Sequence, residues 1–165
     1  MKKIMVGIIL VLICITIFFI INNKISIKNY SNNDFSIKYD NTWKIDNKDE
    51  LKLVHKKSNS IVSIKTMVLD DNYIDTNLNE IVGNVIYSIH DQNKDYNMLS
   101  SDDISDKYQA MSYMFENDSK NVLVNIYKKD AKLIIVYYEA EFKYYDIVLD
   151  SVDSILDSLE IKVGE

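Results

Sequence analysis

Two histidines are the first side chains to consider for chemistry, because imidazole serves both as a metal ligand and as a general base. They are His55 and His90. His55 ends a predicted strand, and His90 lies on the flank of a predicted helix. Neither has the H-x-x-x-H or H-x-H spacing that brings two imidazoles to one metal. We therefore interpret both as structural or surface residues.

Carboxylates are the second candidates, because clustered aspartates supply the oxygen ligands that Ca²⁺ prefers. Three groups stand close together in the sequence: Asp70 with Asp71, Asp102 and Asp103 with Asp106, and Asp34 with Asp40. None of them matches the D-x-[DN]-x-[DN]-G loop with a distal Glu. We interpret these residues as solvated loop carboxylates, and a weak extracellular Ca²⁺ site remains the alternative.

Hydrolytic chemistry finds little support in the residue pattern. No G-x-S-x-G sequence occurs and the serines have no base beside them, which argues against a serine hydrolase. A pair of carboxylates for glycoside hydrolysis stays open, because their spacing is set only in three dimensions. The one tryptophan, Trp43, is weak support for a sugar-binding platform. The single cysteine excludes an intramolecular disulfide and a Cys-based zinc site.

Twelve tyrosines form the last group of candidates. Tyrosine is enriched at interfaces, and many of these side chains fall late in the chain, so they suit a ligand groove or a binding surface. The preference of tyrosine for strands explains them equally well. The sequence therefore predicts no catalytic, cofactor-binding or metal-binding residue, and it does not identify an interface.

The elements that carry these residues are predicted mainly from alternating apolar and polar positions, which indicate strands. Turn-forming residues separate the alternating runs, and the three runs between residues 108 and 140 suit an antiparallel meander. The strands are expected at residues 25–30, 35–39, 51–55, 61–69, 108–116, 121–128, 132–140 and 160–163, with a weaker strand at 97–104.

Two helices are predicted from apolar residues spaced three or four apart. The first runs from Leu78 to Ile89, with Asn77 as its N-cap and Glu80 completing a capping box. Gly83, at the edge of its apolar face, suggests the close approach of a neighbouring segment. The second helix is expected to begin with Asp146 as its N-cap. The order of elements predicts an α+β domain, with a central antiparallel sheet flanked by helices.

A membrane span is predicted before this domain. The residues from Ile4 to Ile21 carry no charge, and as a helix they are roughly 27 Å long, close to the thickness of the bilayer core. Lys2 and Lys3 precede them, which favours a cytoplasmic N-terminus. We expect a stub at residues 1–3, an uncleaved signal anchor at 4–21, a juxtamembrane segment at 22–29 and an extracytoplasmic domain at 30–165.

Two other interpretations of this segment are less favoured. A cleaved signal peptide needs small residues at the cleavage site, and Asn22, Asn23 and Lys24 do not supply them. A lipoprotein needs a small residue before the modified cysteine, but Cys14 follows Ile13 in the middle of the apolar run. We interpret Cys14 as a buried apolar residue.

The charge of the remaining chain is acidic. Lys2 and Lys3 are two of the 19 lysines, so 17 lysines face 25 acidic residues from Asn22 onward, a net charge of −8. A domain with this charge and no basic stripe is a poor candidate for binding nucleic acid or anionic lipid headgroups.

Two short motifs resemble PsbP-like domains. Phe35-Ser36-Ile37-Lys38-Tyr39, followed by Trp43, is similar to the F-S-I-x-Y-P-x-x-W signature at the start of that family. The Tyr-rich strand and the last helix of that family are similar to three segments of this chain, which are residues 137–140, Tyr145-Asp146 and residues 155–161. Asp40 stands where the family usually has Pro, and the glycines common in its middle strands are missing.

The resemblance implies an α/β/α sandwich in which Trp43 packs structurally. The family includes extrinsic subunits of plant photosystem II, a nuclear-import regulator that binds the GTPase Ran, and many anchored prokaryotic proteins. Its members share a binding scaffold without a common catalytic centre. We therefore expect a single-pass membrane protein whose external domain is non-enzymatic, needs no cofactor and binds an exported protein or envelope component. A small cell-envelope hydrolase or carbohydrate-binding domain is the alternative.

Overall fold

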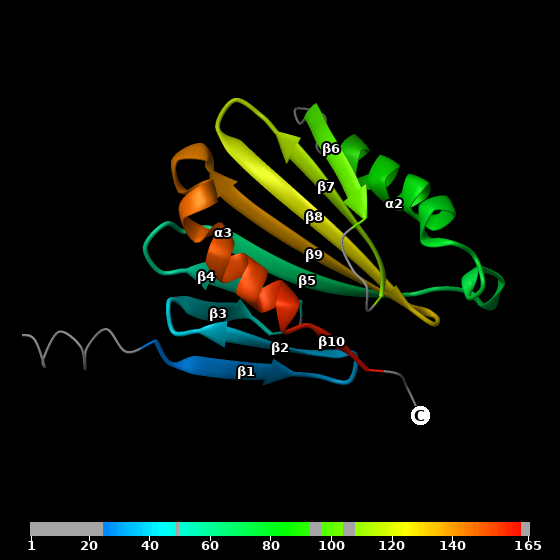
Figure 1. Cartoon of the computed structure of the whole chain (residues 1–165), viewed down its shortest axis with the longest axis horizontal. Helices are drawn as coiled ribbons and strands as arrows, with labels where there is room; N and C mark the ends of the chain where they lie inside the picture. Colours follow the sequence, from blue (N-terminus) through cyan, green and yellow to red (C-terminus); the bar gives the residue numbers. More distant parts are fainter. Residues whose placement is uncertain (1–24, 49, 93–96, 104–107, 163–165) are drawn as a thin grey trace, which may run out of the picture.

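Strands dominate the described part of the chain (Figure 1). The computed structural model describes residues 25–48, 50–92, 97–103 and 108–162. The strands are β1 (Ile27–Ser31), β2 (Phe35–Asp40), β3 (Trp43–Asn47), β4 (Leu51–His55), β5 (Ile61–Val68), β6 (Asn97–Asp103), β7 (Gln109–Glu116), β8 (Lys120–Lys129), β9 (Lys132–Glu141) and β10 (Glu160–Ile161). The helices are the 3₁₀ turn η1 (Asp71–Tyr73), α2 (Leu78–Gln92) and α3 (Phe142–Asp157).

The strands form two antiparallel sheets. The larger has the order β3-β4-β5-β9-β8-β7-β6, and the smaller has the order β1-β2-β10. We expected one central sheet, and the difference arises after β2. The short turn at Asn41 and Thr42 carries the chain from the small sheet into the large one, and the second edge of β2 pairs with β10 instead. The α+β class is confirmed.

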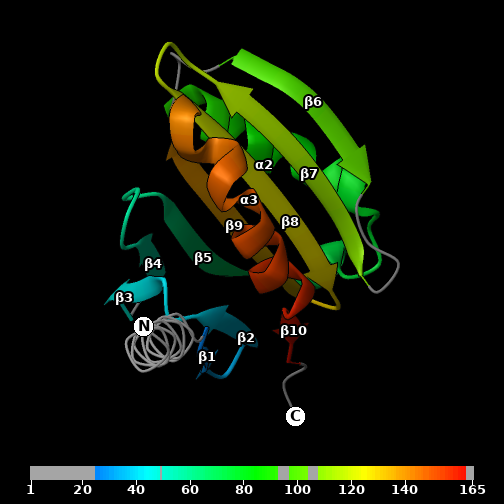
Figure 2. The same ribbon diagram turned by 60° about the vertical axis from the view of Figure 1, so that its left-hand side comes forward.

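The large sheet is the middle layer of the domain, with α3 in front of it and α2 behind it (Figure 2). On the α3 side, Val148, Val152 and Ile155 pack in one buried cluster with strand residues that include Trp43 and Tyr138. On the α2 side, a second buried cluster joins three helix residues to strands β7, β8 and β9; its members are Leu78, Ile81, Val82, Tyr113, Phe115, Val124, Ile126, Leu133 and Ile135.

Most of the predicted elements are confirmed, and the differences have local causes. β3 was missed because its alternation is short and follows a turn. α3 begins at Phe142 rather than Asp146, and its N-cap residue Glu141 makes no side-chain capping bond. Burial of Tyr145 beside Tyr138 extends the helix by one turn, so packing replaces the expected cap.

The start of α2 is confirmed. The Asn77 side chain accepts a hydrogen bond from the backbone N–H of Asn79 at 3.2 Å, as an N-cap does. Gln109 Oε1 on β7 accepts another from the N–H of Leu78 at 3.1 Å, which ties the helix to the sheet. The interpretation of Gly83 is wrong, because a Cβ at this position would meet no atom within 4 Å.

Two turns contain non-glycine residues with positive φ. Asn59 has a φ of 57° and Asp130 has a φ of 52°. Asn and Asp tolerate this left-handed region better than other side chains, because their short polar groups bond to the local backbone. A chain with only three glycines closes its β4–β5 and β8–β9 turns with these two residues instead.

The predicted span from Ile4 to Ile21 lies outside the described residues. Within the described ranges, no helix is both long and apolar enough to cross a membrane. The span therefore stays a prediction. β1 begins at Ile27, inside the predicted juxtamembrane segment, so little chain separates the span from the first strand.

Candidate functional site

The acidic groups of the sequence are not brought together as metal sites. Asp34 and Asp40 lie at opposite ends of β2, and Asp34 pairs with Lys132 at 2.9 Å. Asp70 and Asp71 are exposed at the start of η1. Among the residues that the structure describes, no three His, Cys, Asp or Glu side chains are placed to hold one ion. The structure does not describe the side chains of Asp102, Asp103 and His90, or any part of Asp106.

Asp40 belongs instead to a polar network that joins β2 and β3 to α3. Its Oδ2 accepts a hydrogen bond from Ser151 Oγ at 3.0 Å, and Ser151 Oγ accepts one from Trp43 Nε1 at 2.8 Å. The backbone N–H of Thr42 donates to Oδ1 at 2.7 Å. Partial burial raises the pKa of Asp40, but the bonds from Thr42 and Ser151 and the nearby His55 outweigh it and hold the pKa below its usual value.

Trp43 is fully buried in this network, at 0% exposure. A sugar-binding platform needs an exposed ring face, so Trp43 cannot serve as one in this structure. Its expected role as a packing residue is confirmed. The His55 ring meets its edge at a centroid distance of 5.2 Å, which places the histidine against the same part of the core.

His55 also lies beside a serine, which the sequence pattern did not predict. Its Nδ1 is 2.7 Å from Ser58 Oγ, and Ser58 Oγ is 2.7 Å from Ser60 Oγ. Burial lowers the pKa of His55 and the charge of Lys57 adds to this effect, while the charge of Asp40 opposes it, so the pKa of His55 lies below its usual value.

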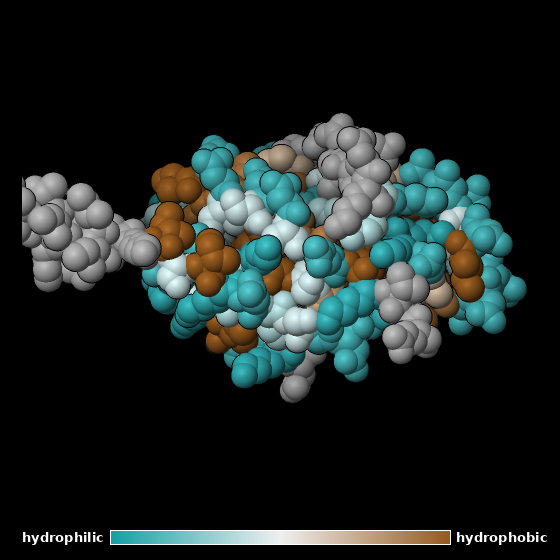
Figure 3. All heavy atoms as spheres, turned by 60° about the horizontal axis from the view of Figure 1, so that its bottom comes forward, coloured by the Kyte–Doolittle hydropathy of each residue, from teal (hydrophilic) through white to brown (hydrophobic). Residues whose placement is uncertain are grey.

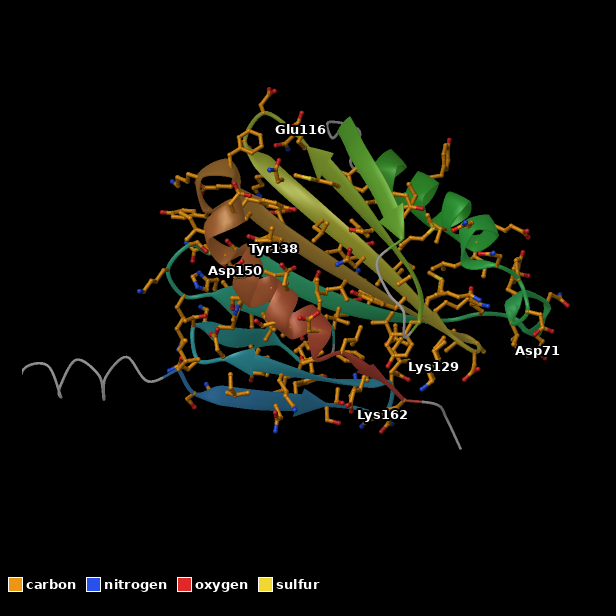
Figure 4. All side chains as sticks on the ribbon, viewed as in Figure 1. Asp71, Glu116, Lys129, Tyr138, Asp150 and Lys162 are labelled. Atoms are coloured by element: carbon orange, nitrogen blue, oxygen red, sulfur yellow. The ribbon has the colours of Figure 1, made fainter. Side chains whose placement is uncertain are left out.

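This arrangement differs from a hydrolytic triad in access and in geometry. Ser58 is 8% exposed and Ser60 is 2% exposed, so neither hydroxyl is open to a substrate. Ser58 also follows His55 by three residues and closes the β4–β5 turn through its backbone N–H. Ser60 at the end of the turn is hydrogen-bonded to the buried Tyr138, whose hydroxyl donates to the carbonyl of Tyr145 at 2.8 Å (Figure 4). The cluster holds the turn in place and offers no accessible nucleophile.

A different surface has the properties of a binding site: the half of the large sheet that α2 does not cover. We call it the open face. It consists of the side chains of β3, β4, β5 and β9 that point away from α3, next to the α2 cluster, whose edge Tyr137 contacts; they are Lys44, Lys52, Val54, Ile61, Ser63, Lys65, Tyr137 and Glu139.

The open face has an apolar centre and a charged margin. Val54 and Ile61 are cross-strand partners, and both are half-buried. Tyr137 lies next to them, and partial burial raises its pKa above the usual value. Around them, Lys52 pairs with Asp46 and Lys65 pairs with Glu50, each at 3.4 Å. An apolar centre with a polar rim is the usual anatomy of a protein interface.

Sequence reasoning missed the open face, although a signal for it exists. The run 133–136 on β9 is apolar throughout, as expected for a stretch of strand that is covered on both faces. The runs 51–55 and 61–66 alternate between apolar and polar residues, as expected for strands with one solvated face. The contrast between these runs indicates which strands the helices leave uncovered.

No protein-family model matches the chain, and neither does any curated protein. Solved structures do match. Cyanobacterial PsbP (CyanoP) from Synechocystis sp. PCC 6803 aligns with a TM-score of 0.66 and 14% identity, over 83% of this chain and 93% of that one. LpqN, described as involved in cell envelope biogenesis of Mycobacterium tuberculosis, aligns with a TM-score of 0.52 and 11% identity, over 88% and 95% of the two chains.

A protein from Bacteroides thetaiotaomicron aligns with a TM-score of 0.52 and 10% identity. The match covers 83% of this chain and 49% of that one, so the fold occurs there as part of a longer protein. Identities this low establish the fold and leave function open. The structural matches agree with the motifs around Phe35 and Tyr138, and the chain has a PsbP-like fold.

Proposed function

We propose that this chain is a membrane-anchored, extracytoplasmic accessory domain without enzymatic activity, which binds an exported protein or another envelope component. The open face is the observation that carries the proposal, because its centre is half-buried and apolar and its margin is charged. The similarity to LpqN, a protein described as involved in cell envelope biogenesis, supports the same setting. The hydrolase or carbohydrate-binding alternative gains no support, since Trp43 and Ser58 are buried.

The size of the open face indicates what kind of complex to expect. Four strands about 4.8 Å apart and about 17 Å long present roughly 330 Å². A stable complex of standard size buries about 800 Å² on each partner. The open face supplies about two-fifths of that area, so it suits a transient complex unless the partner also contacts neighbouring elements. Covalent capture is therefore a better test than simple co-purification.

The test places a photo-cross-linking amino acid at Ile61, in the full chain and in intact cells. The matched control carries the same amino acid at Ser154, which is exposed on α3 at a distance from the open face. We expect Ile61 to give an adduct of discrete mass that the control does not give. Identical adducts at both positions, or none at Ile61, would contradict the proposal.

A further inference from the structure

The strand register shows which residues lie together at one end of the domain. Ile27 pairs with Asp40, Trp43 pairs with His55, and Val54 pairs with Ile61. Ile61 in turn pairs with Glu139, next to the start of α3. The backbone N–H of Phe142 donates to the carbonyl of Ser119 at 3.2 Å, which adds the β7–β8 turn. We call this the entry end, because the first described residues lie there.

Four of the eight large apolar side chains that are exposed among the described residues lie at the entry end. Ile25 is 66% exposed and Ile27 is 61% exposed at the start of the chain. Phe142 is 44% exposed and Ile147 is 75% exposed in the first turns of α3. Figure 3 shows hydrophobic residues grouped on the domain beside the point where residue 25 begins. The other four, Met67, Val68, Tyr73 and Tyr87, lie elsewhere, so the apolar residues of the entry end carry weight only together with their position next to the predicted anchor.

The charges of the domain are distributed unevenly between its two ends. Lys28, Lys56, Lys57 and Lys143 are exposed at the entry end, where Asp118, Glu141 and Asp146 are the exposed acids. The opposite end carries Asp70, Asp71 and Asp75 on one exposed loop, and Figure 4 shows Asp71 there, far from the start of β1. The net negative charge of the whole domain therefore does not describe the entry end, which is close to neutral.

The length of the intervening chain determines what this end must face. Residues 22–24 are all that separate the predicted span from Ile25. Three extended residues reach about 10 Å. If the anchor spans the bilayer, Ile25 stays within this distance of the lipid headgroups, and β1 begins at the membrane surface. In Figure 1 the start of β1, the β4–β5 turn and the first turn of α3 share one side of the domain.

We propose that the entry end rests on the bilayer surface, with Ile27 and Phe142 among the lipid headgroups and the four lysines near the lipid phosphates. This inference rests on the proposed membrane anchor, and it adds a second contact between the protein and the lipid. Its consequence is a fixed orientation of the domain. The long axes of the strands point away from the membrane, and the open face stands beside the bilayer rather than facing it.

The test uses the full chain in phosphatidylcholine vesicles, with Cys14→Ala to remove the native thiol. Single cysteines at Phe142→Cys and Ile27→Cys carry an environment-sensitive fluorophore. The matched control is Val68→Cys, which is 71% exposed at the opposite end. We expect the labels at 142 and 27 to emit at shorter wavelength and to lose emission when spin-labelled lipid is added. The label at 68 should show neither change.

Two outcomes separate this inference from the anchor itself. Vesicle flotation after alkaline carbonate treatment reports whether the chain is integrated in the membrane. A chain that floats but whose labels at 142 and 27 behave like the label at 68 overturns the docking and leaves the anchor standing. A chain that carbonate releases overturns the anchor, and with it the basis of the docking.

Discussion

Replacement of Ser151 by alanine tests whether the Asp40–Ser151–Trp43 network stabilises the domain. Ser151 Oγ accepts from Trp43 Nε1 and donates to Asp40 Oδ2, so one substitution removes both bonds. Trp43 is fully buried and would keep an indole N–H without an acceptor. Leaving a buried donor unsatisfied costs about 1–3 kcal/mol. At about 3 °C per kcal/mol, the melting temperature should fall by roughly 3–9 °C.

Trp43 provides a fluorescence probe of unfolding, and Ser154 provides a matched control position. Trp43 is the only tryptophan, so its fluorescence follows the unfolding of the region that the substitution affects. Ser154→Ala removes a hydroxyl from an exposed position on the same helix, where it donates to the carbonyl of Asp150. The control should change stability by less than about 0.5 kcal/mol. Both variants are compared by urea unfolding of the full chain in mild detergent.

A double-mutant cycle then tests the mechanism of the loss. In a Trp43→Phe background the indole donor is already absent, so Ser151→Ala should cost less than it does in the native chain. Circular dichroism replaces fluorescence for this comparison. Equal losses for Ser151→Ala and Ser154→Ala, or equal losses in both backgrounds, would refute the reasoning about the buried N–H.

Three further predictions concern buried polar groups. Lys128→Ala frees the carbonyls of Ile74 and Thr76, so the loop before α2 should exchange its amide hydrogens faster, at a cost of about 1–3 kcal/mol. The pKa of His55 is lower in the folded state than in the unfolded state. Its contribution to the free energy of unfolding is therefore present above pH 6.5 and is lost as the pH falls toward the folded pKa. His55→Asn should flatten the pH dependence of the free energy of unfolding in that range. Burial raises the pKa of Tyr127 and Tyr145 to about 12, so an ultraviolet titration at pH 11 should find fewer ionised phenols in the folded chain than in urea.

The layered architecture could be predicted from the sequence because its signals are local. Alternation located the strands, and the spacing of Leu78, Ile81 and Val82 located the buried side of α2. The first turn of α3 could not be predicted, because no capping side chain marks it and the burial of Tyr145 depends on β9. The separate small sheet also escaped prediction, since β10 finds its partner β2 only through the tertiary fold.

The polar clusters could not be predicted either, because they also depend on the tertiary fold. Asp40 and Ser151 are 111 residues apart, and no short motif links them. His55 and Ser58 are close in sequence, but their contact depends on the left-handed residue Asn59 in the turn between the strands. A histidine and a serine three residues apart do not by themselves indicate a contact between their side chains. The open face was predictable in principle, from the contrast between alternating and unbroken apolar strands.

The small sheet sets an order on folding. β2 is flanked by β1 from the start of the domain and by β10 from its end, so the sheet is complete only when the last residues are available. The meander from β7 to β9 is built from neighbouring segments and can assemble early, because contacts that are short in sequence form fastest. If residues 4–21 hold the N-terminus in the cytoplasm, as we propose, β1 reaches the outer side of the membrane before β10, and the small sheet closes only after the rest of the domain has followed.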